Sequence, residues 1–261
     1  MRPQPLAGRR IVLTRPREQA APLAALVREA GGEPILFPAI EIEDLADAAP
    51  VRALADRLEE FDLAIFVSPS AVQKALALLR ARRSGRPWPA RLRVAAIGGG
   101  SRSALEREGF SAVIAPQTGA DSEALLALSE LTDVAGQRIV ILRGEGGREL
   151  LGDALAARGA RVERLACYRR SRPGADPAAL LEDWAHGAVH AVAVSSSEGL
   201  QNLAAMLGEA GAERLHDTPL FVPHARVAAE AARLGARAAI VAGPGDAELV
   251  AGLVAYFGGA K

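Results

Sequence analysis

The 261-residue sequence contains a single cysteine, Cys167, so neither an internal disulfide nor a cluster of thiolate metal ligands can form. Its four histidines show no ligand pattern, such as two histidines at helical spacing beside a carboxylate. We therefore expect no metal. One free thiol also fits a reducing compartment, and the cytoplasm is the expected location.

The sequence also lacks net charge and long apolar runs. Lysine plus arginine and aspartate plus glutamate both number 31, which removes any global electrostatic argument for nucleic acid or an anionic membrane as a partner. No run approaches the roughly 18 apolar residues of a membrane span, and Met1 to Arg10 has no signal-peptide core. Any anion site must therefore be local, and we expect a monomer because no unusually apolar helix demands a partner.

The sequence does contain an alternation of short β-branched runs with Ala-, Leu- and Arg-rich stretches of helical period. The run 11–13 precedes a helical stretch at 17–30, and the run 139–142 precedes one at 147–158. Further strands are predicted at 34–37, 62–67, 92–97, 111–114, 160–166, 189–195, 219–222 and 237–241. This alternation predicts an α/β fold with parallel sheets.

Three blocks of the sequence recur in one order at nearly one offset. Residues 9–15 align with 137–143, so that Arg10 matches Arg138, 128 positions later. Residues 61–68 align with 188–195 at an offset of 127, and 105–110 with 231–236 at an offset of 126. These blocks predict an internal duplication that forms two similar lobes, with a ligand cleft between them.

Two extended stretches, 36–43 and 167–173, occupy equivalent places in this repeat. Pro38 and Pro173 disfavour helix there, so we expect both stretches to be linkers. Lobe 1 would then be discontinuous, formed by 1–38 plus 173–261, and lobe 2 would be the continuous segment 41–168.

Small, hydroxylic and arginine residues follow several of the predicted strands. The ends of parallel strands meet at one sheet edge, where glycine permits close backbone approach and free amides at helix starts bind anions. A helix cap or a turn explains each residue taken alone, but their convergence favours an anion site. The candidate ligand-binding residues are Arg15, Ser68, Pro69, Ser70, Gly98, Ser101, Arg143, Gly144, Ser195, Ser196, Ser197 and His224.

Known catalytic and nucleotide motifs are incomplete. The segment 97–101 lacks the third glycine of a dinucleotide fingerprint, because Ser103 occupies that position, and 144–148 lacks the ending of a P-loop. No nucleophile elbow with a histidine and aspartate set is present. Tyr168, on the second predicted linker and facing the expected cleft, is a candidate proton donor. The alternative is an amphipathic linker side chain.

Along nearly its whole length the sequence resembles the uroporphyrinogen-III synthase family. The matching segments are 11–16, 37–42, 61–72, 142–144 with 147–148, and 162–170, which contains Cys167-Tyr168-Arg169-Arg170. Their order and spacing carry the resemblance. It implies two flavodoxin-like lobes, a two-stranded linker and an active site between the lobes.

The resemblance also implies the chemistry. The family's enzymes are cyclising hydro-lyases that take hydroxymethylbilane, a linear tetrapyrrole with eight carboxylates, and need no cofactor. The terminal hydroxyl leaves as water, and the last pyrrole ring is inverted through a spiro intermediate. Tyr168 falls where the family has a tyrosine proposed to assist this departure, and Ser101 fits a family hydroxyl that Val227 lacks in the second half. The competing hypotheses are a non-enzymatic binding protein for an anionic small molecule and a nucleotide-dependent oxidoreductase.

Overall fold

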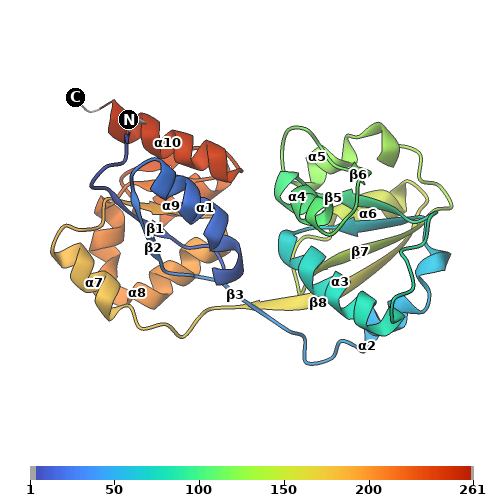
Figure 1. Cartoon of the computed structure of the whole chain (residues 1–261). Coiled ribbons are helices and arrows are strands. Elements are labelled where there is room, and N and C mark those ends of the chain that lie inside the picture. Colours follow the sequence, from blue (N-terminus) through green and yellow to red (C-terminus); the bar gives the residue numbers. More distant parts are fainter. Residues whose placement is uncertain (1–3, 260–261) are drawn as a thin grey trace. The chain divides into compact units, whose positions relative to one another are not determined.

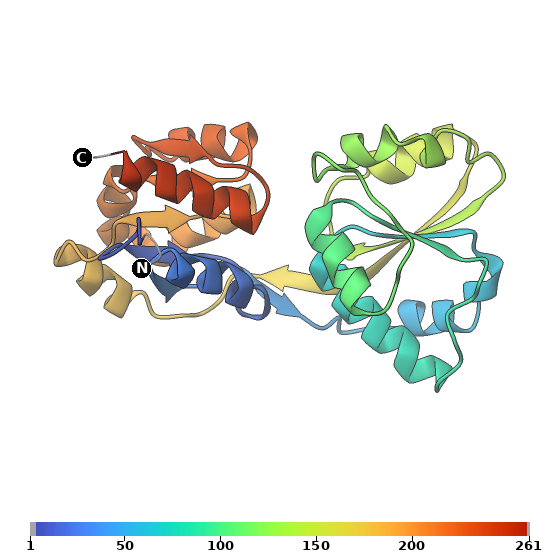
Figure 2. The same cartoon turned by 45° about the horizontal axis from the view of Figure 1, so that its top comes forward.

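The computed structural model describes residues 4–259 and contains two compact units (Figure 1). Unit 1 comprises the described residues up to Glu41 and from Ser171 onward, and unit 2 comprises Ile42–Arg170. In each unit a mainly parallel sheet lies between two layers of helices (Figure 2). The α/β class with parallel sheets, predicted from the alternating runs, is confirmed.

Unit 1 contains a five-stranded sheet in the order β11-β10-β9-β1-β2. Its strands are β1 (Arg10–Leu13), β2 (Glu33–Leu36), β9 (Ala191–Ala193), β10 (Leu220–Val222) and β11 (Ala239–Val241). Its helices are α1 (Arg17–Glu29), α7 (Ala178–Ala185), α8 (Ser197–Asp217), α9 (Ala225–Arg233) and α10 (Asp246–Gly258). α8 bends at Gly208, whose φ of 60° lies outside the helical region.

Alternate strand residues of unit 1 enter different cores, as the pleat of a sheet requires. Val12 and Val192 pack with α7, α8 and α9, whereas Ile11 and Ala191 pack with α1 and α10. Both faces are covered, which explains why these strands read as continuous apolar runs.

Unit 2 contains a six-stranded sheet in the order β3-β8-β7-β4-β5-β6. Its strands are β3 (Glu41–Glu43), β4 (Leu63–Phe66), β5 (Arg93–Ala96), β6 (Val113–Ile114), β7 (Arg138–Gly144) and β8 (Arg161–Ser171). Its helices are α2 (Ala49–Ala55), α3 (Pro69–Arg83), α4 (Gly99–Arg107), α5 (Ser122–Leu126) and α6 (Leu150–Ala157), with short 3-10 turns at Leu58–Glu60 and Ser129–Leu131. The boundary between the units runs through the ends of β3 and β8.

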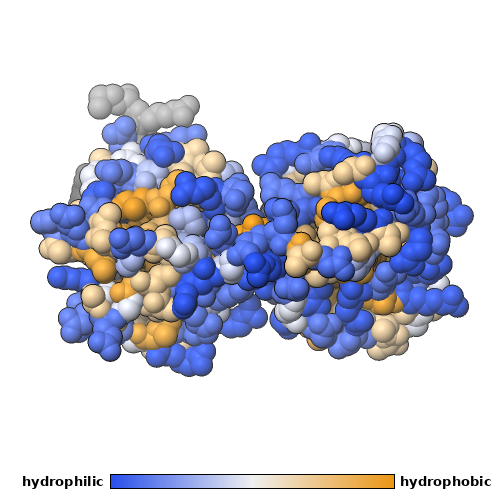
Figure 3. Space-filling view, turned by 90° about the horizontal axis from the view of Figure 1, so that it is seen from below, coloured by the Kyte–Doolittle hydropathy of each residue, from blue (hydrophilic) through white to orange (hydrophobic). Residues whose placement is uncertain are grey.

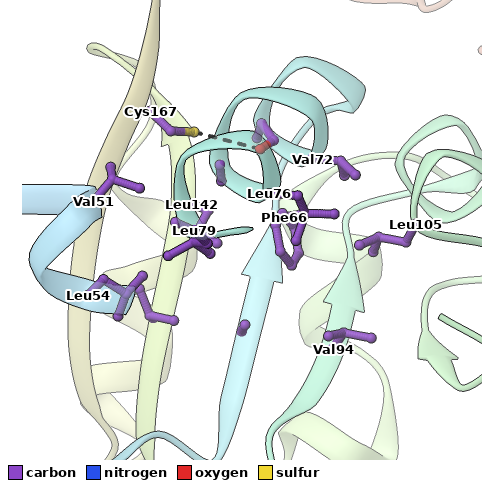
Figure 4. Close-up of a cluster of buried hydrophobic side chains, with 14 of the residues drawn as sticks. Val51, Leu54, Phe66, Val72, Leu76, Leu79, Val94, Leu105, Leu142 and Cys167 are labelled. Atoms are coloured by element: carbon purple, nitrogen blue, oxygen red, sulfur yellow. Dashed lines mark hydrogen bonds between the residues drawn. The ribbon is translucent and has the colours of Figure 1, made fainter. Parts of the chain in front are cut away.

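Cys167 lies in the larger core of unit 2. Figure 4 shows its side chain above the cluster that includes Phe66 of β4 and Leu76 of α3, with its thiol directed at the carbonyl of Ala71, 3.8 Å away. The thiol also donates to the carbonyl of Arg143 at 3.1 Å. Burial raises the pKa of Cys167 to about 12, so the thiol stays protonated and unreactive at neutral pH.

The two sheets share one strand order and one register. Ile11 pairs with Ala191 in unit 1, and Leu63 pairs with Ile139 in unit 2. Ile139 follows Ile11 by 128 positions, and Ala191 follows Leu63 by the same number. The alignment of 61–68 with 188–195 is therefore wrong by one residue, because the strand pairing matches Ser68 with Ser196 rather than with Ser195.

Figure 3 shows hydrophobic areas scattered among hydrophilic residues on the visible face of each unit. None of the helices in residues 4–259 is both long enough and apolar enough to cross a membrane.

Candidate functional site

In unit 2, the predicted site residues lie together at the carboxyl ends of the strands. Because β4, β5, β7 and β8 are parallel, the segments that follow them emerge at one edge of the sheet. The residues at this edge are Ser68, Pro69, Ser70, Gly98, Ser101, Arg143, Gly144 and Tyr168. Convergence of these residues, expected from the strand pattern, is present within this unit.

Ser68 begins α3 and also contacts Tyr168. Its hydroxyl accepts a hydrogen bond from the backbone N–H of Ala71 at 3.0 Å, so Ser68 is the helix N-cap, and Pro69 occupies the first turn. The same hydroxyl lies 3.0 Å from the hydroxyl of Tyr168. Ser70 is buried in the first turn of α3. Ser68 therefore combines a structural role with a contact to the candidate catalytic phenol.

The sequence placed Tyr168 on a predicted linker, and in the structure it lies on a strand that runs into this linker. β8 continues to Ser171, and the side chain of Tyr168 is only 2% exposed within the core of unit 2. Its place opposite Gly144 explains this burial, because a Cβ at position 144 would lie 2.8 Å from Cζ of the tyrosine ring. Because Gly144 has no side chain, the ring of Tyr168 can pack directly against its backbone.

The start of α4 offers backbone donors without a side-chain cap. Gly98 is the N-cap residue and provides no side-chain hydrogen bond, and Gly99 and Gly100 are exposed. No acidic residue occupies the first turn. The free N–H groups and the helix dipole favour an anion here. Ser101 is 3% exposed, so its hydroxyl lies beneath this surface and not on it.

Arg143 is held by its own loop. Its guanidinium donates to Glu149 at 2.9 Å and to the carbonyl of Gly146, and its side chain is only 12% exposed. The sequence pattern identified Arg143 but not Glu149. The position of an acidic residue six places after a strand-end arginine is the sequence signal that could have identified Glu149 as its partner.

Unit 1 places a second arginine at its own strand edge, paired in a similar way. The guanidinium of Arg15 lies 2.6 Å from the carboxylate of Asp246, the first residue of α10. The Nε of Arg15 is buried and has no hydrogen-bond partner. Asp246 was missed because it lies 231 positions from Arg15, although its place in the first turn of a helix is typical of a charge that stabilises the dipole.

The three predicted serines of unit 1 play different roles. Ser196 is the N-cap of α8, and its hydroxyl accepts from the N–H of Gly199 at 3.0 Å. The hydroxyl of Ser197 is buried without a hydrogen-bond partner. Ser195 precedes this cap and is half-buried.

His224 begins α9 in the same way that Gly98 begins α4. It is the N-cap residue without a side-chain hydrogen bond, and Ala225 and Arg226 in the first turn are exposed. Both helices contain nine residues, and neither has an acidic residue in its first turn. Each unit therefore presents a helix start at its strand edge that has neither a side-chain cap nor an acidic residue in its first turn, which is suited to a carboxylate or phosphate.

The described residues supply anion-binding groups and one phenol rather than a set of catalytic acids and bases. Within residues 4–259, no group of three or more His, Cys, Asp or Glu side chains could hold a metal ion. The arrangement can bind a polyanion at several points and donate a proton from the Ser68 and Tyr168 pair.

Comparison with known proteins identifies relatives. A family model described as uroporphyrinogen-III synthase HemD matches residues 21–251. The uroporphyrinogen-III synthase of Salmonella typhimurium is 40% identical over 196 residues, covering 74% of this chain and 78% of the relative. The Escherichia coli enzyme of the same name is 38% identical with the same coverage.

Solved structures share the fold. The uroporphyrinogen III synthase of Thermus thermophilus matches with a TM-score of 0.59 and 23% identity, covering 95% of this chain and 97% of that one. The Helicobacter pylori uroporphyrinogen-III synthetase matches with a TM-score of 0.58 and 12% identity, covering 95% and 99%.

Proposed function

Because this chain belongs to the uroporphyrinogen-III synthase family, we propose that it cyclises hydroxymethylbilane to uroporphyrinogen III. It is a cyclising lyase of porphyrin biosynthesis. The reaction expels the terminal hydroxyl as water, inverts the last pyrrole ring through a spiro intermediate and closes the macrocycle. The match over residues 21–251 is the observation that carries this conclusion.

In our proposal, Ser68 and Tyr168 assist the departure of the hydroxyl. The leaving oxygen needs a proton, and the Ser68 hydroxyl is the more exposed member of the pair. Ser68 donates that proton, and the buried Tyr168, 3.0 Å away, replaces it. The last pyrrole ring releases one proton when the macrocycle closes, and this proton restores the Tyr168 phenol, so the net loss is one water. After hydroxyl departure the pyrroles supply the reactivity, and the protein chiefly positions them.

The carboxylates of the substrate bind at the strand edges of the two units in this proposal. The uncapped starts of α4 and α9 supply N–H donors, and Arg226 adds a positive charge at the second of these. Arg15 and Arg143 are already paired with Asp246 and Glu149. Each guanidinium therefore binds a substrate carboxylate while it keeps its protein partner. The proposed binding residues remain Arg15, Ser68, Pro69, Ser70, Gly98, Ser101, Arg143, Gly144, Ser195, Ser196, Ser197 and His224. No metal or organic cofactor takes part.

We also propose that the two flavodoxin-like units arose by internal duplication, with 36–43 and 167–173 as the linkers. The shared strand order supports this, since β2, β1, β9, β10 and β11 correspond in order to β8, β7, β4, β5 and β6. Each unit then combines strands from both repeats. The asymmetric pair Tyr168 and Ile40, 128 positions apart, would give the repeats different roles.

An isomer assay tests the function. Purified protein, supplied with freshly generated hydroxymethylbilane, should yield the type III isomer, resolved chromatographically after oxidation. Heat-denatured protein is the control and should give the type I isomer that forms spontaneously. Type I product alone with native protein would instead favour an anion-binding protein. We propose a cytoplasmic monomer that binds no nucleic acid, and sedimentation equilibrium tests the oligomeric state.

A further inference from the structure

A cavity lies at the edge of unit 2 opposite the candidate site. It has a volume of about 680 Å³ and is formed by the end of α3, the loop 84–92, the start of β5 and the loop 108–112. α3 contains 15 residues, so its two ends are about 20 Å apart. Ser68 caps one end and the cavity adjoins the other. The proposed reaction does not use this cavity.

The walls of the cavity are apolar and aromatic. Leu76 and Leu79 belong to the buried core, and the partly exposed rings of Trp88 and Phe110 pack edge to face with centroids 5.1 Å apart. The indole N–H of Trp88 donates to the carbonyl of Leu92 at 2.9 Å, which fixes the ring. A cavity of this size and lining is typical of sites for small organic molecules.

The rim of the cavity carries an excess of arginine. Residues 80–93 contain six arginines and no acidic residue, although the whole chain has a formal net charge of zero. Four arginines line the cavity, opposed there by Glu108 alone. These four are Arg80, Arg83, Arg86 and Arg93. The ends of α3 and α4 carry partial negative charge, and the arginines reverse its sign.

The four arginines are not equally available to a ligand. Arg83 is 5% exposed and donates to the carbonyl of Ala55 and to Glu59, so it holds the loop in place. Arg80 is paired with Glu108. Arg86 lies 3.6 Å from a carboxylate oxygen of Asp56, whose other oxygen already accepts from Arg82 at 2.8 Å. Among the rim arginines that face a carboxylate, the half-exposed guanidinium of Arg86 is therefore the most weakly held.

The guanidinium of Arg93 donates to a neutral group, the side-chain oxygen of Gln137 at 3.0 Å, and interacts with the charge of Glu130 without a direct ion pair. From these contacts we propose that the cavity binds a planar aromatic anion, such as an aromatic carboxylate or sulfonate. Its rings pack against Trp88 and Phe110, and its acid group binds at the rim, chiefly to Arg86. Guanidinium groups suit this ligand because they both pair with oxyanions and stack on aromatic rings.

Titration with 8-anilinonaphthalene-1-sulfonate, an aromatic sulfonate, tests the proposal on the full chain. We expect saturable binding that quenches tryptophan emission, because Trp88 lines the cavity whereas Trp184 is buried in unit 1. Trp184→Phe should keep the quenching, and Trp88→Phe should lose it. Arg86→Gln should weaken binding about tenfold, the effect of one charge-assisted hydrogen bond.

Arg107→Gln is the matched control, because it removes the same charge from an exposed position of unit 2 that does not line the cavity. It should bind the sulfonate like the unchanged chain, and Arg93→Gln provides a second rim variant. Three results would overturn the proposal: no saturable binding, equal weakening by Arg107→Gln, or equally tight binding of the uncharged N-phenyl-1-naphthylamine. Arg86→Gln should still cyclise hydroxymethylbilane, so this test is separate from that of the proposed function.

Discussion

The contact between the hydroxyls of Tyr168 and Ser68 ties the candidate chemistry to two side chains. Tyr168→Phe removes one hydroxyl and keeps the buried ring. We expect turnover to fall by about 100-fold, the usual contribution of a positioned proton donor, and the free energy of unfolding to fall by only about 1 kcal/mol. Single-turnover isomer assays and urea unfolding measure the two effects.

Tyr256→Phe is the matched control for this change, because Tyr256 is the other tyrosine of the chain and lies 45% exposed on α10. It should leave turnover unchanged. If Tyr168→Phe also cyclised substrate at the normal rate, the phenol would have no part in hydroxyl departure and Ser68 would need another proton source.

Gly144 determines where the Tyr168 ring can lie. In Gly144→Ala, the added Cβ would lie 2.9 Å from one ring carbon and 3.0 Å from the hydroxyl oxygen. We expect a loss of about 1–3 kcal/mol in the free energy of unfolding and a slower turnover, because the ring must move away from Ser68. Urea unfolding and the single-turnover assay detect both effects.

Gly174→Ala is the control for Gly144→Ala, since position 174 has open space for a Cβ and no positive φ. It should leave the free energy of unfolding within about 0.5 kcal/mol of the unchanged value. Equal stability of the two variants would contradict the tight packing of the tyrosine ring on Gly144.

The sequence predicted which residue types gather at the strand ends but not how they pair. Tyr168 was expected on a linker, since neither the continuation of β8 to Ser171 nor the facing Gly144 is visible as a local pattern. Asp246 was missed for the same reason, because its ion pair with Arg15 joins opposite ends of the chain. Contacts between distant residues depend on the whole fold and leave no local signature.

At the scale of elements, one histidine couples the starts of two neighbouring strands. The backbone N–H of Arg10, the first residue of β1, donates to Nδ1 of His190, the residue before β9, at 3.0 Å. Burial, followed by the nearby charge of Arg9, lowers the pKa of His190. The neutral imidazole is the form that can accept this hydrogen bond.

This pairing predicts a pH dependence for the stability of unit 1. Because the folded pKa of His190 is lowered, the unfolded chain binds the proton first, and stability falls as pH drops below about 6.5. His190→Asn should weaken this fall between pH 7 and 5, measured as the free energy of urea unfolding. His186→Asn, at an exposed position, should leave it intact, and an equal effect of both changes would exclude the role of His190.

Element positions were more predictable than their alignment. Apolar β-branched runs marked the strands, because strands covered on both faces need apolar residues on both. The same uniformity made the block 188–195 fit one residue out of register, since neighbouring apolar positions look alike. Only the hydrogen-bonded pairing of Ile11 with Ala191 fixes the register and identifies Ser196 as the counterpart of Ser68. β3 is three residues long and gave no strand signal.

At the scale of the whole molecule, the proposed sequence repeats and the structural units do not coincide. The sheet of unit 1 takes β1 and β2 from the first repeat and β9 to β11 from the second, and the sheet of unit 2 takes the remaining strands. The alternating runs predicted parallel sheets, but the strand order within each sheet emerges only from the pairing. Each unit nevertheless builds its cores from its own residues.

Separate cores predict that unit 2 folds without unit 1. The segment 42–170 is continuous, contains both cores of the unit, and begins and ends at strands that are neighbours in its sheet. We expect it to show cooperative urea unfolding and the circular dichroism of an α/β protein.

The segment 1–128 is a matched control of nearly equal length. It contains the first proposed repeat but lacks β7 and β9, so β4 loses its partner β7 and β1 loses its partner β9. It should remain unfolded. If 1–128 folded and 42–170 did not, the repeat and not the mixed sheet would be the folding unit.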